Sequence, residues 1–182
     1  DLIEFAKLHK LKIGTIADLI AYRLKHDRTI ERTAELPFQS DYGSKLKLIV
    51  YTDHIAGAEH IAIVKGELSP NIPTFVRMHA LNILDDVLGD LTSGRNHDVK
   101  IAIKMISAES SGVFVLIREP HRRKVSDLVL SRLNKQNNPS TNNINSELRD
   151  YGAGAQILLD LGIKKMILLS NTKKNIIGLE GY

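Results

Sequence analysis

Two strongly apolar segments in the first half constrain the fold of this chain more than any other feature. Residues 45–53 read KLKLIVYTD and residues 60–65 read HIAIVK, and a short stretch that includes residues 55–58 separates them. Short segments rich in Val, Ile and Leu are typical of β-strands, and a loop of a few residues joins antiparallel neighbours. The sequence therefore predicts an antiparallel hairpin at this point.

Further strands and helices are expected on both sides of the hairpin. Residues 29–34 alternate like an edge strand that Pro37 ends, and residues 74–79 form a strand that leads into a polar loop. The later segments with a regular pattern are a mostly buried helix at 98–107, a buried strand at 112–117, helices at about 123–135 and 151–161, and a strand at 165–169. Residues 136–145, QNNPSTNNIN, predict a polar loop. Because helices and strands alternate only in the second half, the predicted fold class is α/β, with a mixed sheet flanked by helices.

The first 26 residues have a pattern of their own. Apolar residues between Leu2 and Leu8 predict a short amphipathic helix. Thr15, which follows Gly14, is typical of the N-cap of a second helix that runs to about residue 24. We therefore expect residues 1–26 to be separate from a main domain of residues 27–182.

Composition excludes several classes of protein. The chain has no cysteine, which excludes disulfides, a cysteine nucleophile and thiolate metal sites. Apolar residues at 43% and charged residues at 25% are ordinary for a globular protein. No apolar run approaches the roughly 20 residues that a membrane helix needs, and Asp1 and Glu4 stand where a secretory signal would be basic, so we expect a cytoplasmic location without membrane contact. The net charge of +4 comes from dispersed basic residues, which indicates a solvated surface and no nucleic-acid partner, and is compatible with a phosphate-bearing ligand.

Residues 75–96, FVRMHALNILDDVLGDLTSGRN, form the stretch most typical of a functional site, because a polar loop with two glycines follows a strand end. His79 at that strand end fits two interpretations: a site histidine beside a phosphate, or a histidine that is simply hydrogen-bonded. Asp85 and Asp86 fit a metal or acid–base pair, or more simply a loop or the first turn of a helix.

The same stretch resembles the zinc site of GTP cyclohydrolase II, the enzyme that opens the guanine ring of GTP at the start of riboflavin synthesis. The family's pattern is R-V-H-S-E-C, then ten residues, then C-x-C. Laid against it without a gap, the matching residues are Arg77, His79, Asp86, Val87, Gly89 and Leu91, and the three cysteines are replaced by Asn82, Ser93 and Arg95. The block DYGAGAQILLDLG at 150–162 is similar to the family's Y-x-x-G-A-Q-I-L-x-D-L-G. The resemblance covers nearly the whole chain and implies a GTP cyclohydrolase II-like fold.

The replaced cysteines imply a domain without the family's zinc cofactor. Catalytic zinc needs three good protein ligands, and thiolates bind it well because they are soft anionic donors. An Asn amide and a Ser hydroxyl are not comparable ligands, and Arg95 places a positive charge where the cation would lie. Without the metal, no water there has its pKa lowered enough to attack a purine carbon at neutral pH. His97 and Asp98 could offer a replacement nitrogen–oxygen site, which the guanidinium of Arg95 opposes.

The family's R-Q-E-G-R-G loop, which contacts the triphosphate, corresponds to residues 118–123, R-E-P-H-R-R. Arg118 and Arg122 remain, but the glutamate and both glycines are lost, and Pro120 removes a backbone amide that could approach a phosphate. The helix expected at 123–135 shows no catalytic pattern and is interpreted as scaffold.

The family's D-x-R, in which the Asp accepts a proton and the Arg is proposed as a nucleophile, aligns with residues 147–149. Lys174 stands where the family has a phosphate-contacting lysine. The resemblance therefore implies Glu147 and Arg149 as vestigial catalytic residues, and Arg77, His79, Arg122 and Lys174 as residues for a phosphate or nucleotide.

The phrase KIGTIADLIAYR at 12–23 resembles the closing segment of 3,4-dihydroxy-2-butanone 4-phosphate synthase. In many bacteria that synthase is fused upstream of GTP cyclohydrolase II. The resemblance implies that residues 1–26 are the tail of such a synthase and its linker, that the chain is the C-terminal half of a bifunctional protein, and that the fused synthase is the active enzyme.

Three hypotheses remain at this point. The first is a cyclohydrolase-like domain that has lost zinc-dependent GTP hydrolysis and supports or regulates the fused synthase. The second is an active GTP cyclohydrolase II with unusual metal ligands, and the third is an effector domain that binds GTP or another phosphorylated metabolite. The resemblance also implies a homodimer.

Overall fold

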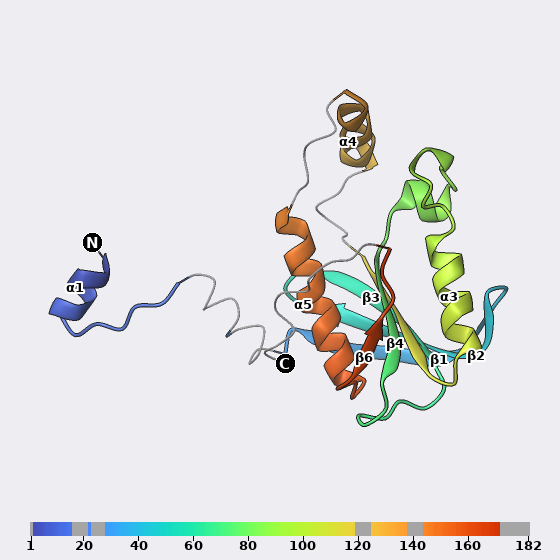
Figure 1. Ribbon diagram of the computed structural model, residues 1–182, viewed down its shortest axis with the longest axis horizontal. Helices are drawn as coiled ribbons and strands as arrows, with labels where there is room; N and C mark the ends of the chain where they lie inside the picture. Colours follow the sequence, from blue (N-terminus) through green and yellow to red (C-terminus); the bar gives the residue numbers. More distant parts are fainter. Residues whose placement is uncertain (1, 16–21, 23–27, 119–124, 138–143, 172–182) are drawn as a thin grey trace.

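One mixed sheet of six strands, in the order β1-β2-β3-β5-β4-β6, forms the body of the protein in the computed structural model, which describes residues 2–15, 22, 28–118, 125–137 and 144–171 (Figure 1). The strands are β1 (Ile30–Ser40), β2 (Gly43–Asp53), β3 (Ala58–Lys65), β4 (Thr74–Ala80), β5 (Gly112–Ile117) and β6 (Met166–Leu168). The helices are α1 (Leu2–Leu8), α3 (Asp98–Ala108), α4 (Val125–Asn137) and α5 (Ile144–Asp160), with a π-helical turn η1 (Ile83–Val87) and a 3-10 turn η2 (Leu91–Ser93). Strands β1, β2, β3 and β5 pair antiparallel, whereas β4 pairs parallel with both β5 and β6, so the predicted α/β class with a mixed sheet is confirmed.

The predicted hairpin is confirmed as β2 and β3. Their register pairs Leu46 with Lys65 and Asp53 with Ala58. The Asp53 side chain accepts hydrogen bonds from the backbone amides of Ile55 and Ala56, at 2.8 and 2.9 Å. This local turn satisfies the amides that leave the ladder, and it fixes the register of the two strands.

Strand β1 is longer than the sequence predicts, because Pro37 does not end it. The strand continues to Ser40, and Pro37 faces Lys47 on β2. Because β1 lies at the edge of the sheet, a residue without an N–H group is tolerated there as it would not be in a central strand. The edge position itself was predicted correctly, but the end of the strand was not.

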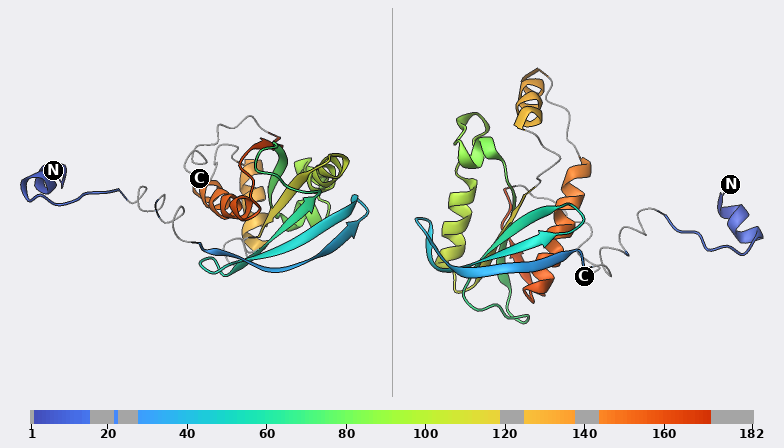
Figure 2. Two further views of the ribbon diagram at one scale, coloured as in Figure 1. Left: turned by 90° about the horizontal axis from the view of Figure 1, so that it is seen from below. Right: turned by 180° about the vertical axis from the view of Figure 1, so that it is seen from behind.

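Helices cover both faces of the sheet (Figures 1 and 2). Helix α5 packs on one face, over a core that includes Ile49, Val76, Val113, Val115 and Ile157. Helix α3 packs on the other face, over a core that includes Leu46, Ile63, Ile103, Ile106 and Phe114. Strand β5 lies between β3 and β4 and is buried at five of its six positions, as a strand covered on both faces must be.

Two expectations about the helices are wrong. Helix α3 is not mostly buried, because Ile101 and Met105 on its outer side are 53% and 50% exposed. Only one side of this helix meets the sheet, so its apolar residues exceed what that side can bury. Helix α5 begins at Ile144, not near residue 151, and α4 extends to Asn137, so both ends of the predicted loop at 136–145 are helical.

The N-terminal segment is described only in part. The short helix predicted between Leu2 and Leu8 is confirmed as α1, which lies apart from the sheet (Figure 1). The second helix expected from Thr15 falls almost entirely outside the described residues. None of the helices that the structure describes combines the length and the apolar character required to cross a bilayer.

A glycine lets α5 lie close against β4. A Cβ atom at Gly154 would be 2.8 Å from the sulfur of Met78, which is shorter than a side-chain contact allows. Gly112 has a similar position at the start of β5, where a Cβ would be 2.9 Å from Ile106 and 3.2 Å from the Phe75 carbonyl. Both helices therefore pack closely on the sheet at these glycines, and a larger residue would have to displace the Met78 or Ile106 side chain.

A charged cluster joins the edge strand to the end of α5. The Tyr51 hydroxyl donates to Asp160 at 2.8 Å, and Arg32 donates to the same carboxylate oxygen from Nε at 3.0 Å and Nη2 at 2.7 Å. Tyr51 is fully buried, and burial together with the hydrogen bond and charge of Asp160 raises the pKa of its hydroxyl. Burial by itself raises the pKa of Asp160, but the hydrogen bonds from Arg32 and Tyr51 hold it below its ordinary value.

Asp160→Ala is expected to lower the free energy of unfolding by about 1–2 kcal/mol, because the buried Tyr51 hydroxyl loses its acceptor. Urea denaturation followed by circular dichroism measures the change. Glu35→Ala is the matched control: it removes the other carboxylate that contacts Arg32, at 3.2 Å, and this carboxylate is about as exposed as that of Asp160, but the Tyr51 hydroxyl donates to Asp160 and not to Glu35. The control should therefore change stability by less than about 0.5 kcal/mol. Equal effects of the two variants would contradict a stabilising role for the hydrogen bond from Tyr51 to Asp160.

Candidate functional site

The candidate site lies at the carboxyl ends of β4, β5 and β6, which point to the same edge of the sheet. Strand β4 carries Arg77 and His79, and the chain then passes through the site segment, defined here as residues 81–97, before α3 begins. Arg77 pairs with Phe114 and His79 with Leu116 on β5. The carboxyl edge of parallel strands is where α/β proteins commonly place their functional groups.

His79 is a buried, hydrogen-bonded histidine. Its Nε2 lies 2.8 Å from Asp86 Oδ2, and its ring stacks near Phe114 with centroids 6.0 Å apart. The backbone N–H of Asn82 donates to the same oxygen of Asp86 at 2.8 Å. His79 is therefore hydrogen-bonded, and its second interpretation, a contact with a phosphate, stays a prediction. Asp86 acts in the first turn of η1 and ties that turn to β4.

Arg77 is also buried, and it belongs to a second cluster. Its Nη1 donates to the Leu169 carbonyl at 3.0 Å and to the Asn171 side chain at 3.3 Å, and its Nη2 lies 3.7 Å from Asp98. Asp98 also accepts from Arg95 Nε at 3.2 Å and from Asn171 Nδ2 at 2.8 Å. The Asp98 carboxylate is thus shared by two guanidinium groups and an amide.

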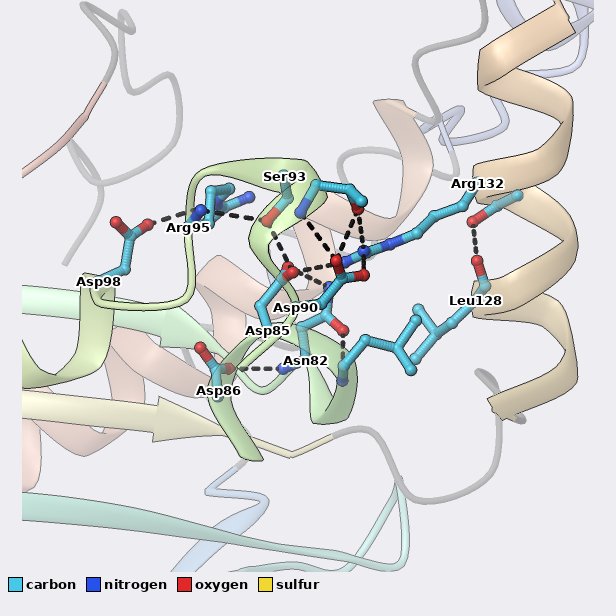
Figure 3. A network of polar contacts seen from close by, with 12 residues as sticks. Asn82, Asp85, Asp86, Asp90, Ser93, Arg95, Asp98, Leu128 and Arg132 are labelled. Carbon is cyan, nitrogen blue, oxygen red and sulfur yellow. Dashed lines mark hydrogen bonds and ion pairs between the residues drawn. The ribbon is translucent and has the colours of Figure 1, made fainter. Parts of the chain in front are cut away.

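Asp85 is the centre of the site segment (Figure 3). Its side chain is only 3% exposed and accepts from Asn82 Nδ2 and Ser93 Oγ, each at 2.7 Å. Arg132 Nη2 donates to the same carboxylate. Two of the three positions at which the resembled family carries cysteines therefore converge on one carboxylate. The third, Arg95, contacts Asp98 with its side chain and donates its backbone N–H to Ser93 Oγ at 3.1 Å.

Short-range caps shape the site segment. Asn82 caps η1, with its side-chain oxygen accepting from the Leu84 amide at 3.1 Å. Asp90 caps η2 by accepting from the Thr92 amide at 2.8 Å, and Gly94 closes that turn at φ 66°. A left-handed residue is the common way to end such a turn, and glycine adopts it without strain. The spacing of these caps brings Ser93 back to Asp85.

Arg132 is the residue that sequence reasoning missed. It projects from α4, which we had interpreted as scaffold, and reaches Asp85 and Asp90 together, while its Nη1 donates to Thr92 Oγ1 at 3.0 Å. No local pattern could have revealed it, because 47 positions separate it from Asp85. Its charge also affects its partner: burial alone raises the pKa of Asp85, but hydrogen bonds from Ser93 and Arg132 and the charge of Arg132 bring it below its ordinary value.

The remaining predicted site residues cannot be placed beside these clusters. Glu147 and Arg149 lie in the first turns of α5, where the backbone is described but these side chains are not. Arg122 and Lys174 lie outside the described residues. Their roles stay predictions.

His97 and Asp98 lie where the site segment meets α3. Asp98 pairs with Arg95 at 3.2 Å and with Arg77 at 3.7 Å, and His97 Nε2 lies 3.4 Å from Asn96 Nδ2. A joint metal site of His97 and Asp98 stays a prediction. Among the residues that the structure describes, no three His, Asp or Glu side chains group around a metal position. A surface hollow does occur elsewhere, over β1 and β2 beside Pro37, Lys45 and Leu46, away from the site segment.

Comparison with known proteins gives a consistent family. The family described as GTP cyclohydrolase II matches residues 31–182. Riboflavin biosynthesis protein RibBA of Synechocystis is 38% identical over 191 residues, which is 100% of this chain and 34% of that protein. Monofunctional riboflavin biosynthesis protein RIBA 2, chloroplastic, of Arabidopsis thaliana is 37% identical, over 98% of this chain and 37% of that protein.

A solved structure is also similar along the whole chain. RibBX from A. baumannii, a two-domain 3,4-dihydroxy-2-butanone 4-phosphate synthase, is 32% identical with a TM-score of 0.62, and the match covers 100% of this chain and 46% of that one. The chain thus spans between about a third and a half of the length of the relatives that it matches.

Proposed function

The chain belongs to the GTP cyclohydrolase II family, and on this premise we propose that its domain has lost zinc-dependent hydrolysis of GTP and supports or regulates a fused 3,4-dihydroxy-2-butanone 4-phosphate synthase. The single observation that carries the proposal is the use of Asn82 and Ser93 as hydrogen-bond donors to Asp85.

The donor set at the site is a poor fit for zinc. The Asn82 amide nitrogen is a donor only, and the oxygens of Asn82 and Ser93 are neutral ligands that already accept the backbone amides of Leu84 and Arg95. A permanent guanidinium charge from Arg132 already neutralises the same carboxylate. Zinc would have to displace these contacts and accept weaker ligands than thiolates. We therefore assign no step of a hydrolytic reaction to a metal here.

The proposal of a fused synthase is supported by the different ranges that the family and the relatives match. The family match begins at residue 31, whereas RibBA of Synechocystis and RibBX align over the whole chain, including residues 1–30. Residues 1–26 therefore fit the tail of a preceding domain, and residues 27–182 the cyclohydrolase-like domain. RibBX supports this division most directly, because it is a two-domain synthase. A homodimer in the cytoplasm completes the proposal.

An active cyclohydrolase is the second candidate, and the family match over residues 31–182 favours it. It needs a metal held by ligands other than cysteine. The effector hypothesis shares with it a requirement for GTP binding, so one set of measurements separates all three.

We expect the purified full-length protein to contain less than about 0.1 zinc ion per chain, because the site lacks soft ligands, and to release no formate from GTP. Metal analysis by mass spectrometry and a formate assay measure both quantities, and a cysteine-containing family member is the positive control. Stoichiometric zinc with formate release would overturn the proposal in favour of an active enzyme. Saturable GTP binding without turnover would favour the effector domain instead. If the domain supports or regulates the fused synthase, as proposed, deletion of residues 27–182 should lower the activity or stability of that synthase.

A further inference from the structure

Helix α4 is held to the rest of the protein by few groups. Among the side chains that the structure describes, its hydrogen bonds and ion pairs to other elements all come from Arg132. Three apolar residues on the helix, Val129, Leu130 and Leu133, are between 43% and 55% exposed. Burial of apolar area therefore contributes little to the position of α4, and the polar contact has to supply most of it.

We propose that the guanidinium of Arg132 is an internal counter-ion that closes the site segment and fixes α4 against it. The group of residues involved, called here the Arg132 cluster, consists of Arg132, Asp85, Asp90 and Thr92. Figure 3 shows Arg132 reaching from α4 between the two turns of the site segment.

The charges of the cluster require a cation at this position. Asp85 is buried, and Asp90 is only about a quarter exposed. Two carboxylates this close repel each other, and a buried one is costly unless a positive group pairs with it. The Arg132 side chain is itself 25% exposed, so it enters the cluster without complete loss of hydration.

The shape of the guanidinium suits the cluster better than a point charge would. One terminal nitrogen, Nη2, contacts Asp85, and the other, Nη1, contacts Asp90 and Thr92. Asp85 belongs to η1, whereas Asp90 and Thr92 form the cap of η2. One planar group thus joins both turns to α4, which a lysine ammonium cannot do with the same geometry.

The inference concerns the same site as the proposed function, but it is tested separately. Arg132→Ala should lower the thermal midpoint by about 3–8 °C, and α4 amides should exchange hydrogen at least about tenfold faster, while the amides of β5 keep their protection. Millimolar guanidinium chloride should restore a large part of the lost midpoint in this variant. The same concentration of sodium chloride should not, and neither salt should raise the midpoint of the wild type.

Control variants make the outcome decisive. Asp85→Asn and Asp90→Asn combined with Arg132→Ala should show no rescue, because both carboxylates that would hold the added guanidinium are gone. Arg132→Lys should be more stable than Arg132→Ala, but less stable than Arg132→Ala with added guanidinium. If Arg132→Ala does not fold, Arg132→Lys is used in its place. Equal protection of α4 in the wild type and the variant, or no rescue by guanidinium, would overturn the counter-ion role. Zinc in the wild type together with rescue would instead contradict only the proposed function.

Discussion

Three cysteines introduced together, by Asn82→Cys, Ser93→Cys and Arg95→Cys, are expected to give the protein about one bound zinc ion per chain. The geometry supports this, because Asn82 and Ser93 already reach the same carboxylate and the backbone of Arg95 contacts Ser93. The triple variant also removes the guanidinium of Arg95. Metal analysis after dialysis measures the change.

The matched control for this result is a variant that carries only Asn82→Cys and Ser93→Cys. It should lose zinc on dialysis, because the ion would have only two thiolates and would have to compete with Arg132 for the Asp85 carboxylate as a third ligand. The triple variant is not expected to hydrolyse GTP, since residues 118–123 still lack the family's glutamate and glycines. A zinc-free triple variant would show that the site segment no longer has the geometry of the family's site.

Asp85→Ala should be the most destabilising single change within the site segment, with a loss of about 2–4 kcal/mol of unfolding free energy. The variant leaves the Asn82 amide, the Ser93 hydroxyl and one end of the Arg132 guanidinium without their shared acceptor. The estimate lies below that for a fully buried ion pair, because Arg132 is partly exposed. Denaturant unfolding at pH 7 provides the measurement.

Asp90→Ala is the comparison for that variant. It removes the second carboxylate that contacts Arg132 and the cap of η2, but Asp90 is more exposed and accepts no bond from Asn82 or Ser93. We expect a loss of about 1 kcal/mol. If Asp90→Ala were as harmful as Asp85→Ala, Asp85 would not be the centre of the site segment.

Most of the sheet could be predicted from the sequence because its strands have local signals. The hairpin of β2 and β3 and the buried strand β5 were predicted from apolar composition and short connections. The end of β1 could not be predicted, because a proline is compatible with a strand only at an edge, and edge position is a property of the assembled sheet. The start of α5 was missed for a similar reason: its first turns are polar, so nothing local separates them from the preceding loop.

The site was predictable only where a family pattern marks it. Asn82, Ser93 and Arg95 were identified by position, but their hydrogen-bond partners were not. Asp85 was interpreted as a residue of a helix turn, and it does lie in η1, yet its main role is to collect donors from three separate places. Arg132 lies on a helix with no distinguishing pattern, so only the folded chain could bring it to Asp85.

The two edge strands of the sheet differ in length, and this bears on whether the isolated domain aggregates. One margin is the 11-residue β1 and the other is the three-residue β6. A long open strand can recruit a strand from another molecule and begin aggregation, but β1 carries Glu31, Arg32, Glu35 and Pro37 along its length. Charges and a missing amide discourage such pairing, and a strand as short as β6 offers little to pair with. The sheet is thereby protected against joining edge to edge into fibres.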